Sequence, residues 1–493
     1  MHALLTLILS FAGALACGLM PAGRARQIRW VALAFASLGL LTALHCALRY
    51  GGSGVADEVD WPWIPSLGAR LAFGYDGISL PLLLVTGLVA VCGVLFTWEL
   101  KERANEFYAY YFALVGGVYG VFLSRDLFLL FVFYEIAVVP KYFLIAIWGG
   151  TRKDYAAMKL VLYSFAGSAL VLLGLLGLYF GANASTFTLQ ELSQASLSAP
   201  LQYVVFPLLF VGFAVLAGMW PFHTWAPTGH VAAPTAASML LAGVVMKLGA
   251  YGCLRVAIGL LPLGAKVWAP WVAALAVVNI VYGALVALRQ TDFKFVIGYS
   301  SVSHMGFVLL GLATLTQTGL TGAVLQMFSH GVIGALLFAL VGAVIYSRTH
   351  TRQLEEFHLL IARMPVIAWV FILAGLASMG LPGFSGFAAE LHVLMGAWQS
   401  PWVSAGLVVL AGAGVVATFG YTLVKIHEAF FRPRVASGSS DKEGLYEPMT
   451  AAEIAGCALL LGSSLLVGLF PSLLTDKMQA SLKLIVDRLN EAR

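Results

Sequence analysis

Charged residues are scarce in this sequence of 493 residues. They make up only 10% of the chain, whereas 60% of it is hydrophobic. An ordinary soluble domain has about 25% charged residues. No soluble fold could bury so much apolar surface, so the composition predicts a chain that lies in lipid. Its length then counts membrane spans of about 20 apolar residues each, rather than soluble domains.

Paired cysteines and nucleotide-binding patterns are also missing. The five cysteines are isolated and no CxxC pair occurs, which argues against an iron–sulfur cluster or a zinc site. No glycine-rich dinucleotide motif and no P-loop stands between a strand and a helix. We therefore expect no metal and no cofactor in this chain, and no nucleic acid among its partners.

What the sequence does contain is a series of apolar runs, which predicts an all-α integral membrane protein of about fourteen transmembrane helices. The first run lacks a basic start, so we interpret it as a membrane helix rather than a signal peptide. Pro221 and Pro227 at the end of the seventh run, and Pro382 in the twelfth, predict two broken helices. The runs fall near residues 3–20, 29–47, 80–98, 108–123, 127–149, 156–181, 203–222, 235–261, 268–288, 295–314, 318–346, 364–398, 402–431 and 452–473.

The two broken helices stand in corresponding segments of the chain, which indicates two inverted five-helix repeats with ion sites near the midplane. We expect residues 1–106 to form three helices and an outer loop. Residues 107–261 and 262–435 would form the first and second repeat. Residues 436–493 would hold a cytoplasmic loop, the last helix and an amphipathic tail.

Basic residues gather in alternate loops, which predicts the orientation of the chain. The loops rich in lysine and arginine should be cytoplasmic, so that with fourteen spans both termini lie on the outer side. The amphipathic C-terminal stretch is expected to rest on that outer surface. The basic residues of the predicted cytoplasmic loops are Arg24, Arg26, Arg29, Lys101, Arg103, Arg152, Lys153, Arg289, Lys294, Arg348, Arg352, Arg363, Arg432, Arg434 and Lys442.

Ionisable residues also occur deep inside the apolar runs. Each costs about 2.5–3.5 kcal/mol in hydrocarbon, or on the order of 20 kcal/mol for the whole set if unpaired, so they should face one another, water or a protein interior. Such groups can load and release protons when a neighbouring charge moves. The set consists of Glu135, Lys141, Lys159, Lys247, His304, His330, Glu390 and Lys425.

Several of these positions keep a structural alternative. The mid-span carboxylates and Lys247 could tie helices together, although function is the default for such groups. Both histidines could satisfy a buried backbone carbonyl instead of relaying protons. Lys159 and Lys425 lie near span ends and could extend to the interface. Lys294 and Asp292 stand at a loop edge, and we interpret them as an orientation signal or an interface pair.

The motifs around these residues resemble a known family, subunit M (chain 4) of NADH–quinone oxidoreductase, or respiratory complex I. The resemblance extends from about residue 70 to the end of the thirteenth run. It also covers the wider antiporter-like superfamily, with its multisubunit cation/proton antiporters and membrane-bound hydrogenases. The motifs are FYEIAVVPKYFLIAIWGG, WPFHTWAPTGHVAAPTAASMLLAGVVMKLGAYGCLR, QTDFKFVIGYSSVSHMGFV and LASMGLPGFSGFAAEL.

The resemblance implies a proton-translocating subunit of a redox-driven quinone oxidoreductase in the cell inner membrane. It implies an essential Glu135, a central Lys247, axial His304 and His330, and an exit-side Glu390. It further implies that quinone, FMN and iron–sulfur clusters belong to partner subunits. These partners would be a peripheral redox arm and other antiporter-like and small membrane subunits.

One departure from the family pattern concerns a lysine that pairs with the fifth-helix glutamate, because this chain has Leu216 there. We suggest that Lys141 replaces it. Six residues along a helix separate Lys141 from Glu135 by about 9 Å and about 120°, so the geometry gives partial support. His223, which follows the seventh-run break, is a further accessory candidate, as are the two lysines near span ends.

Three rival functions remain open from the sequence. The chain could belong to a sodium or potassium/proton antiporter, or to a membrane-bound hydrogenase, and neighbouring genes would separate these readings. A structural membrane anchor is the third rival. The buried ionisable residues argue against an anchor, which has no reason to bear their cost.

Overall fold

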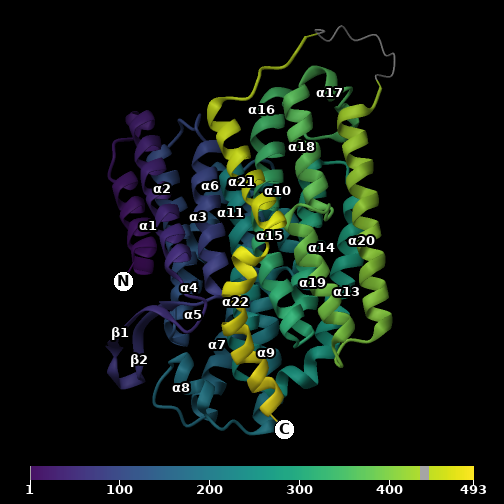
Figure 1. The fold of residues 1–493 in the computed structure, drawn as a ribbon. Coiled ribbons are helices and arrows are strands. Elements are labelled where there is room, and N and C mark those ends of the chain that lie inside the picture. Colours follow the sequence, from purple (N-terminus) through teal and green to yellow (C-terminus); the bar gives the residue numbers. More distant parts are fainter. Residues whose placement is uncertain (1, 434–443, 493) are drawn as a thin grey trace.

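The structure is a computed structural model that describes residues 2–433 and 444–492, so Arg434 and Lys442 lie outside the described residues. It is a bundle of long, roughly parallel helices (Figure 1). Twelve helical segments of the described chain are long and apolar enough to cross a membrane, and α1 (His2–Gly18) and α18 (Pro365–Ser378) are shorter apolar helices. The predicted all-α membrane class is confirmed.

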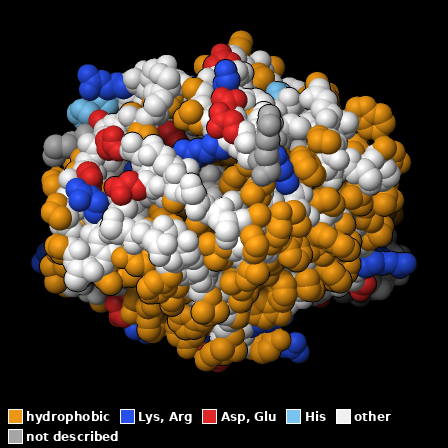
Figure 2. All heavy atoms as spheres, turned by 90° about the horizontal axis from the view of Figure 1, so that it is seen from below, with side chains coloured by type: hydrophobic (Ala, Val, Ile, Leu, Met, Phe, Trp, Pro, Cys, Tyr) orange, Lys and Arg blue, Asp and Glu red, His pale blue; other side chains and the backbone are white. Residues whose placement is uncertain are grey.

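Most spans are single continuous helices. The surfaces of several of them carry exposed Leu, Val, Phe and Trp side chains, and Figure 2 shows hydrophobic side chains over a broad area of the molecule seen from below. The continuous helices are α2 (Ala25–Arg49), α3 (Ser79–Phe96), α4 (Ala104–Leu123), α7 (Lys153–Gly181), α13 (Pro262–Arg289), α14 (Phe293–Ala313), α15 (Gln317–Ala339), α20 (Ala405–Ile426) and α21 (Ala451–Leu469).

Two spans are interrupted where the prolines predict it. Helix α9 (Ala199–Ala217) ends before Pro221, and the chain resumes as η3 (Phe222–Thr224) and α10 (Trp225–Ala232). Helix α18 ends before Pro382, and α19 (Ser385–Gln399) follows. The expectation that Pro227 also breaks the helix is wrong, because Pro227 lies in the first turn of α10, where its missing N–H costs nothing. The repeat boundaries stay a prediction.

A third interruption was not predicted. Helix α5 (Leu127–Ile136) stops at Ala137 and α6 (Val138–Trp148) begins directly after it. Pro140 explains the site, because a proline removes one helical hydrogen bond and its ring crowds the carbonyl four residues earlier. The break therefore follows Glu135 immediately.

The span that carries Lys247 contains two π-helical turns. In chain order it consists of α11 (Thr235–Leu240), the π-helical η4 (Leu241–Val245), α12 (Met246–Gly252) and the π-helical η5 (Cys253–Ile258). Further π-helical turns extend α15 as η6 (Leu340–Ile345) and α20 as η8 (His427–Phe431). Such turns are rare and frequently occur at functional sites.

Elements at one end of the bundle depart from pure membrane helices. A hairpin of β1 (Ala56–Ile64) and β2 (Ala69–Tyr75) pairs antiparallel there, and the fourteen-run prediction had only a loop in its place. Helix α8 (Leu189–Gln194) and the end of α22 (Ser472–Glu491) lie at the same lower end (Figure 1). The predicted amphipathic tail is α22, which buries residues at helical spacing: Leu474, Met478, Leu482, Ile485 and Leu489.

Candidate functional site

Lys247 lies at the centre of the site and is completely buried. Its Nζ lies 2.7 Å from Nδ1 of His330 on α15, and it also donates a hydrogen bond to the carbonyl of Ala242 in the preceding π-helical turn. Because the amine is held by one imidazole and one carbonyl, a proton on Lys247 has a direct neighbour to which it can pass.

The contacts continue from His330 to the second broken helix. The rings of His330 and His304 have centroids 5.6 Å apart. His304 Nδ1 lies 3.2 Å from Glu390 Oε1, and its Nε2 lies 3.2 Å from Ser378 Oγ. Four predicted residues from four helices therefore form one connected series, which we call the relay: Lys247, His330, His304 and Glu390.

The break between α18 and α19 makes room for the Glu390 carboxylate. Gly380 has φ +78°, and a Cβ at this position would stand 3.0 Å from Glu390 Oε2. Beside the carboxylate lies a cavity of about 10 Å³ lined by His304, Gln326, His330 and Glu390 among others, which is at the lower limit for one water molecule. A water there would bridge the imidazoles and the carboxylate.

Lys425 lies next to the relay rather than at the lipid interface. A second cavity, of about 30 Å³, is lined by both Ser378 and Lys425, so Ser378 borders the two cavities. The Nζ of Lys425 forms an ion pair with Glu428 Oε2 at 2.8 Å, and its side chain is buried. The Lys425 side chain is therefore buried and paired, while its partner Glu428 is 34% exposed, and a role for Lys425 in proton transfer stays a prediction.

Glu135 and Lys141 behave differently from the relay. Glu135 Oε1 is buried without a hydrogen-bond partner, and Lys141 Nζ is likewise without one, although that side chain is only 1% exposed. No ion pair joins the two within the described residues, and the polar groups that act on the carboxylate are Ser168 and Lys141. Leu216 is buried as well. The replacement of the family lysine by Lys141 stays a prediction.

The two accessory candidates of the first half lie apart from the relay. The ring of His223 stands 5.1 Å from that of Tyr282, and neither of its ring nitrogens has a hydrogen-bond partner. Lys159 is half-buried and donates a long hydrogen bond of 3.5 Å to Thr228 Oγ1. The structure thus does not bring these residues to Lys247.

Lys294 is a residue whose place the sequence interpretation missed. It is buried rather than at a loop edge, and its Nζ donates to the Ala233 carbonyl at 3.0 Å and to Ser238 Oγ at 3.4 Å. Asp292 instead caps α14 and pairs with Arg352 at 3.4 Å. The capping aspartate was the available signal, because it places Lys294 inside the first helical turn.

A cavity at the end of the bundle that carries the predicted cytoplasmic loops lies near Lys294, which is not itself one of its lining residues. This cavity, of about 400 Å³, is lined by Thr235, Gly342 and Arg348 among others. A Cβ on Gly342 would stand 2.8 Å from Thr235 Oγ1 and 2.9 Å from Lys294 Cε. His230, which is completely buried with both ring nitrogens unpartnered, is close enough to Lys247 and Lys294 to respond to their charges.

A buried amine, two imidazoles and a carboxylate that connect a span with π-helical turns, two continuous helices and a broken helix are typical of an antiporter-like membrane subunit. Residues 124–418 match the sequence profile of the family described as NADH:quinone oxidoreductase/Mrp antiporter, TM. The chain belongs to this family.

Individual relatives point to one group within this family, the chain-4 subunits. Over 482 residues the chain is 38% identical to NAD(P)H-quinone oxidoreductase chain 4 1 of Synechococcus sp. (strain JA-3-3Ab), with 95% of this chain and 90% of the relative covered. It is 39% identical over 464 residues to NAD(P)H-quinone oxidoreductase chain 4 of Acaryochloris marina (strain MBIC 11017), with 92% and 86% covered. The recognition of a chain-4 relative is confirmed.

Solved structures show the same fold. A chain of respiratory complex I from Thermus thermophilus superposes with a TM-score of 0.88 at 29% identity, covering 98% of this chain and 100% of that chain. A chain of the Mrp complex from Dietzia sp. DQ12-45-1b superposes with a TM-score of 0.86 at 20% identity, covering 99% and 98%. The second likeness speaks for the fold alone.

Proposed function

We propose that this chain translocates protons as a membrane subunit of a redox-driven NADH (or other donor):quinone oxidoreductase. The observation that carries the proposal is the relay from Lys247 to Glu390. The subunit itself would carry no redox centre, and quinone, FMN and iron–sulfur clusters would belong to partner subunits. Its partners would be a peripheral redox arm and further antiporter-like and small membrane subunits. We place it in the cell inner membrane with both termini outside.

The relay moves a proton by changing the charge next to it. A proton on Lys247 is favoured while no positive charge stands nearby, and it is repelled toward His330 when a neighbouring amine becomes charged. From His330 it passes to His304, through the intervening cavity, and then to Glu390, which accepts it as a carboxylate. Each proton moved against the membrane potential requires about 2.3 kcal/mol per 100 mV, which a nearby charge change at low dielectric can supply.

Lys294 and His230 lie on the side from which the proposed pathway takes up protons. The 400 Å³ cavity reaches Gly342, which packs against Lys294, and the charges of Lys247 and Lys294 both act on the buried imidazole of His230. Lys294 therefore serves as the uptake group between the cytoplasmic cavity and Lys247.

The decisive experiment follows electron transfer and proton transport together in inverted membrane vesicles that carry Lys247→Met. The variant should keep donor-driven quinone reduction measurable and the complex assembled, while proton uptake per electron falls to background. Lys101→Met, which removes an exposed lysine at the bundle end, is the matched control and should pump normally. Unchanged proton uptake in Lys247→Met would refute the proposal.

The same vesicles distinguish the antiporter alternative. Without an electron donor, an imposed sodium or potassium gradient should produce no proton flux that depends on Lys247. A Lys247-dependent flux driven by the cation gradient alone would assign the chain to a cation/proton antiporter instead.

A further inference from the structure

A second polar site lies at the opposite end of the bundle from the Lys294 cavity. It is a cavity of about 300 Å³ between the loop before β1, helix α8, the end of η5 and helix α22. Its charged lining residues are Asp76, Arg125, Arg255 and Arg488. None of these belongs to the relay, and the proposed proton pathway does not use them.

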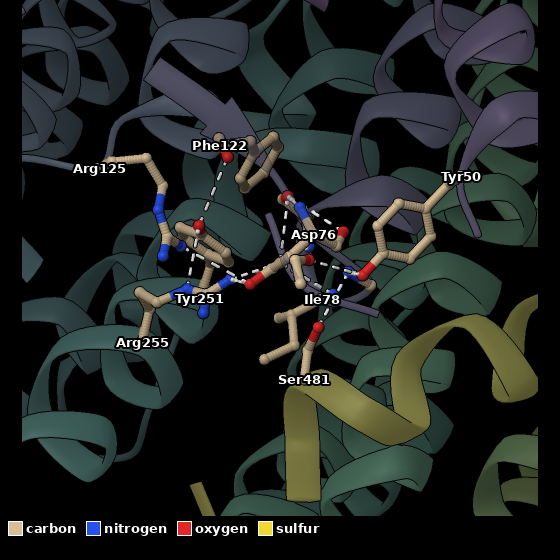
Figure 3. Close-up of polar contacts among 11 residues, drawn as sticks. Tyr50, Asp76, Ile78, Phe122, Arg125, Tyr251, Arg255 and Ser481 are labelled. Atoms are coloured by element: carbon tan, nitrogen blue, oxygen red, sulfur yellow. Dashed lines mark hydrogen bonds and ion pairs between the residues drawn. The ribbon is translucent and has the colours of Figure 1, made fainter. Parts of the chain in front are cut away.

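Asp76 is already fully engaged (Figure 3). Both of its carboxylate oxygens accept hydrogen bonds from Arg255, and Arg125 Nη1 lies 3.6 Å from Oδ2. The carboxylate also accepts hydrogen bonds from the backbone N–H groups of Ile78 and Ser79. Burial would raise the pKa of Asp76, but Arg255 and Arg125 outweigh burial and lower it below its usual range. Asp76 is therefore ionised and offers nothing further to a ligand.

The arginines, in contrast, have capacity to spare. The guanidinium of Arg125 makes no hydrogen bond with any described residue and touches only the far oxygen of Asp76. Arg488 donates to Ser193 Oγ at 2.8 Å and weakly to the Gly259 carbonyl at 3.5 Å. Each guanidinium has five N–H donors, so several of them face the cavity.

The lining is also short of negative charge. Three arginines face one aspartate, and Glu58 and Glu491 act on Arg125 and Arg488 respectively from farther away. Burial, and then the charge of Arg255, lower the pKa of both Arg125 and Arg488. A bound anion would relieve this repulsion between like charges.

We propose that this cavity binds the phosphate group of an anionic ligand between Arg125, Arg255 and Arg488. Planar guanidinium groups match the oxygens of phosphate in pairs, and 300 Å³ is ample for a phosphate group. Leu260, Leu484 and Ile485 add an apolar border. The phosphate can come from an anionic phospholipid headgroup or from free inorganic phosphate.

The test uses the purified complex that contains the full-length chain, stripped of lipid in detergent. Binding of inorganic phosphate is measured with ³²P-orthophosphate, and binding of phosphatidylglycerol by native mass spectrometry, with zwitterionic phosphatidylethanolamine for comparison. The variants are Arg488→Gln and Arg125→Gln, with Arg488→Lys as the charge-preserving change. Lys483→Gln removes an exposed positive charge from the same helix, α22, and is the matched control.

Loss of one charge-assisted contact should weaken binding at least about tenfold in Arg488→Gln and Arg125→Gln. Arg488→Lys should fall between these variants and the unchanged complex, and Lys483→Gln should stay within about twofold of it. Phosphatidylglycerol bound without competition by phosphate identifies the headgroup as the source, and saturable phosphate binding identifies the free ion. Absence of binding for both probes, or an equal loss in Lys483→Gln, would overturn the proposal.

Discussion

The two halves of the protein treat their buried ionisable groups in different ways. In the second half, to which Lys247 of the first half is joined through His330, every member of the relay has a polar neighbour within hydrogen-bond reach or a facing ring. In the first half, the half-buried Glu135 and the buried Lys141 lie next to a broken helix, and Glu135 Oε1 and Lys141 Nζ have no hydrogen-bond partner among the described residues. An unpaired buried charge is costly. The second half reduces this cost by pairing its polar groups, whereas the first half leaves Lys141 Nζ unpaired.

The difference coincides with the departure from the family pattern. The resemblance puts a lysine where this chain has Leu216, and Leu216 lies on α9, whose backbone packs tightly against α12 at Gly249. The resemblance implies that a lysine at this position pairs with Glu135, and this chain has no amine there. Among the described residues, the groups that form a connected series are those with polar partners on facing helices.

The largest effect should come from breaking the connected half. His330→Ala removes the imidazole between Lys247 and His304, and loss of a proton-transfer group typically costs about 100-fold or more. Proton transport in inverted vesicles should drop accordingly while the complex still assembles. His392→Ala is the control, because His392 bonds only to the Ala388 carbonyl of its own helix. Normal pumping by His330→Ala would show that the relay is not the pathway.

The next effect concerns the unconnected half. If Lys141 has taken over the missing pairing role, Lys141→Ala should reduce proton transport by about tenfold or more, which is less than the about 100-fold typical of a lost proton-transfer group. Adding Leu216→Lys in that background should restore part of the activity. Val139→Ala, an exposed position on the same helix α6, should have no effect. Undiminished transport in Lys141→Ala would dispose of the replacement.

A moderate effect is expected at the uptake side. Lys294→Met removes the buried amine near the cytoplasmic cavity, yet the imidazole of His230, on which Lys294 acts, remains. Proton transport should slow by about three- to tenfold, and the slowing should be greatest at high pH, where protons are scarce. Arg289→Gln, an exposed charge at the same end, is the control. A rate equal to that of the unchanged protein would remove Lys294 from the pathway.

The smallest effect should be one of stability. Gly380→Ala places a Cβ against the Glu390 carboxylate at a positive φ, a strain of about 1–3 kcal/mol. The complex should unfold a few degrees lower in a thermal melt. Gly412→Ala is the control, because a Cβ there meets nothing within 4 Å and alanine favours a helix. Equal melting temperatures for the two variants would show that the break tolerates a side chain.

Features that one physical property decides were predictable from the sequence. Apolar length fixes the spans, and Pro382 between two glycines fixes the second break, so both were predictable. Features that depend on packing against residues far away in the chain were not. Lys294 looks like a loop residue because the fold that buries it comes from Ala233 and Ser238, 61 and 56 positions away in the chain. The β1–β2 hairpin was missed because β1 carries Pro62, a residue that argues against a strand.

The sequence predicts which residues belong to the relay, but not which of them contact one another. Hydrophobic context singles out the four members of the relay, yet no periodicity indicates that His304 lies beside Glu390. Such pairings depend on how helices far apart in the chain pack together.

The two π-helical turns on either side of Lys247 have a mechanical consequence. A π-helical turn holds one residue more than an α-helical turn, and one residue corresponds to about 100° of rotation about the helix axis. If the extra residue of one π-helical turn moved to the other side of α12, only this short segment would rotate about its axis. The helix beyond each turn would keep its orientation. The amine of Lys247 would then turn by about 100° about the helix axis, while both ends of the span stay in place.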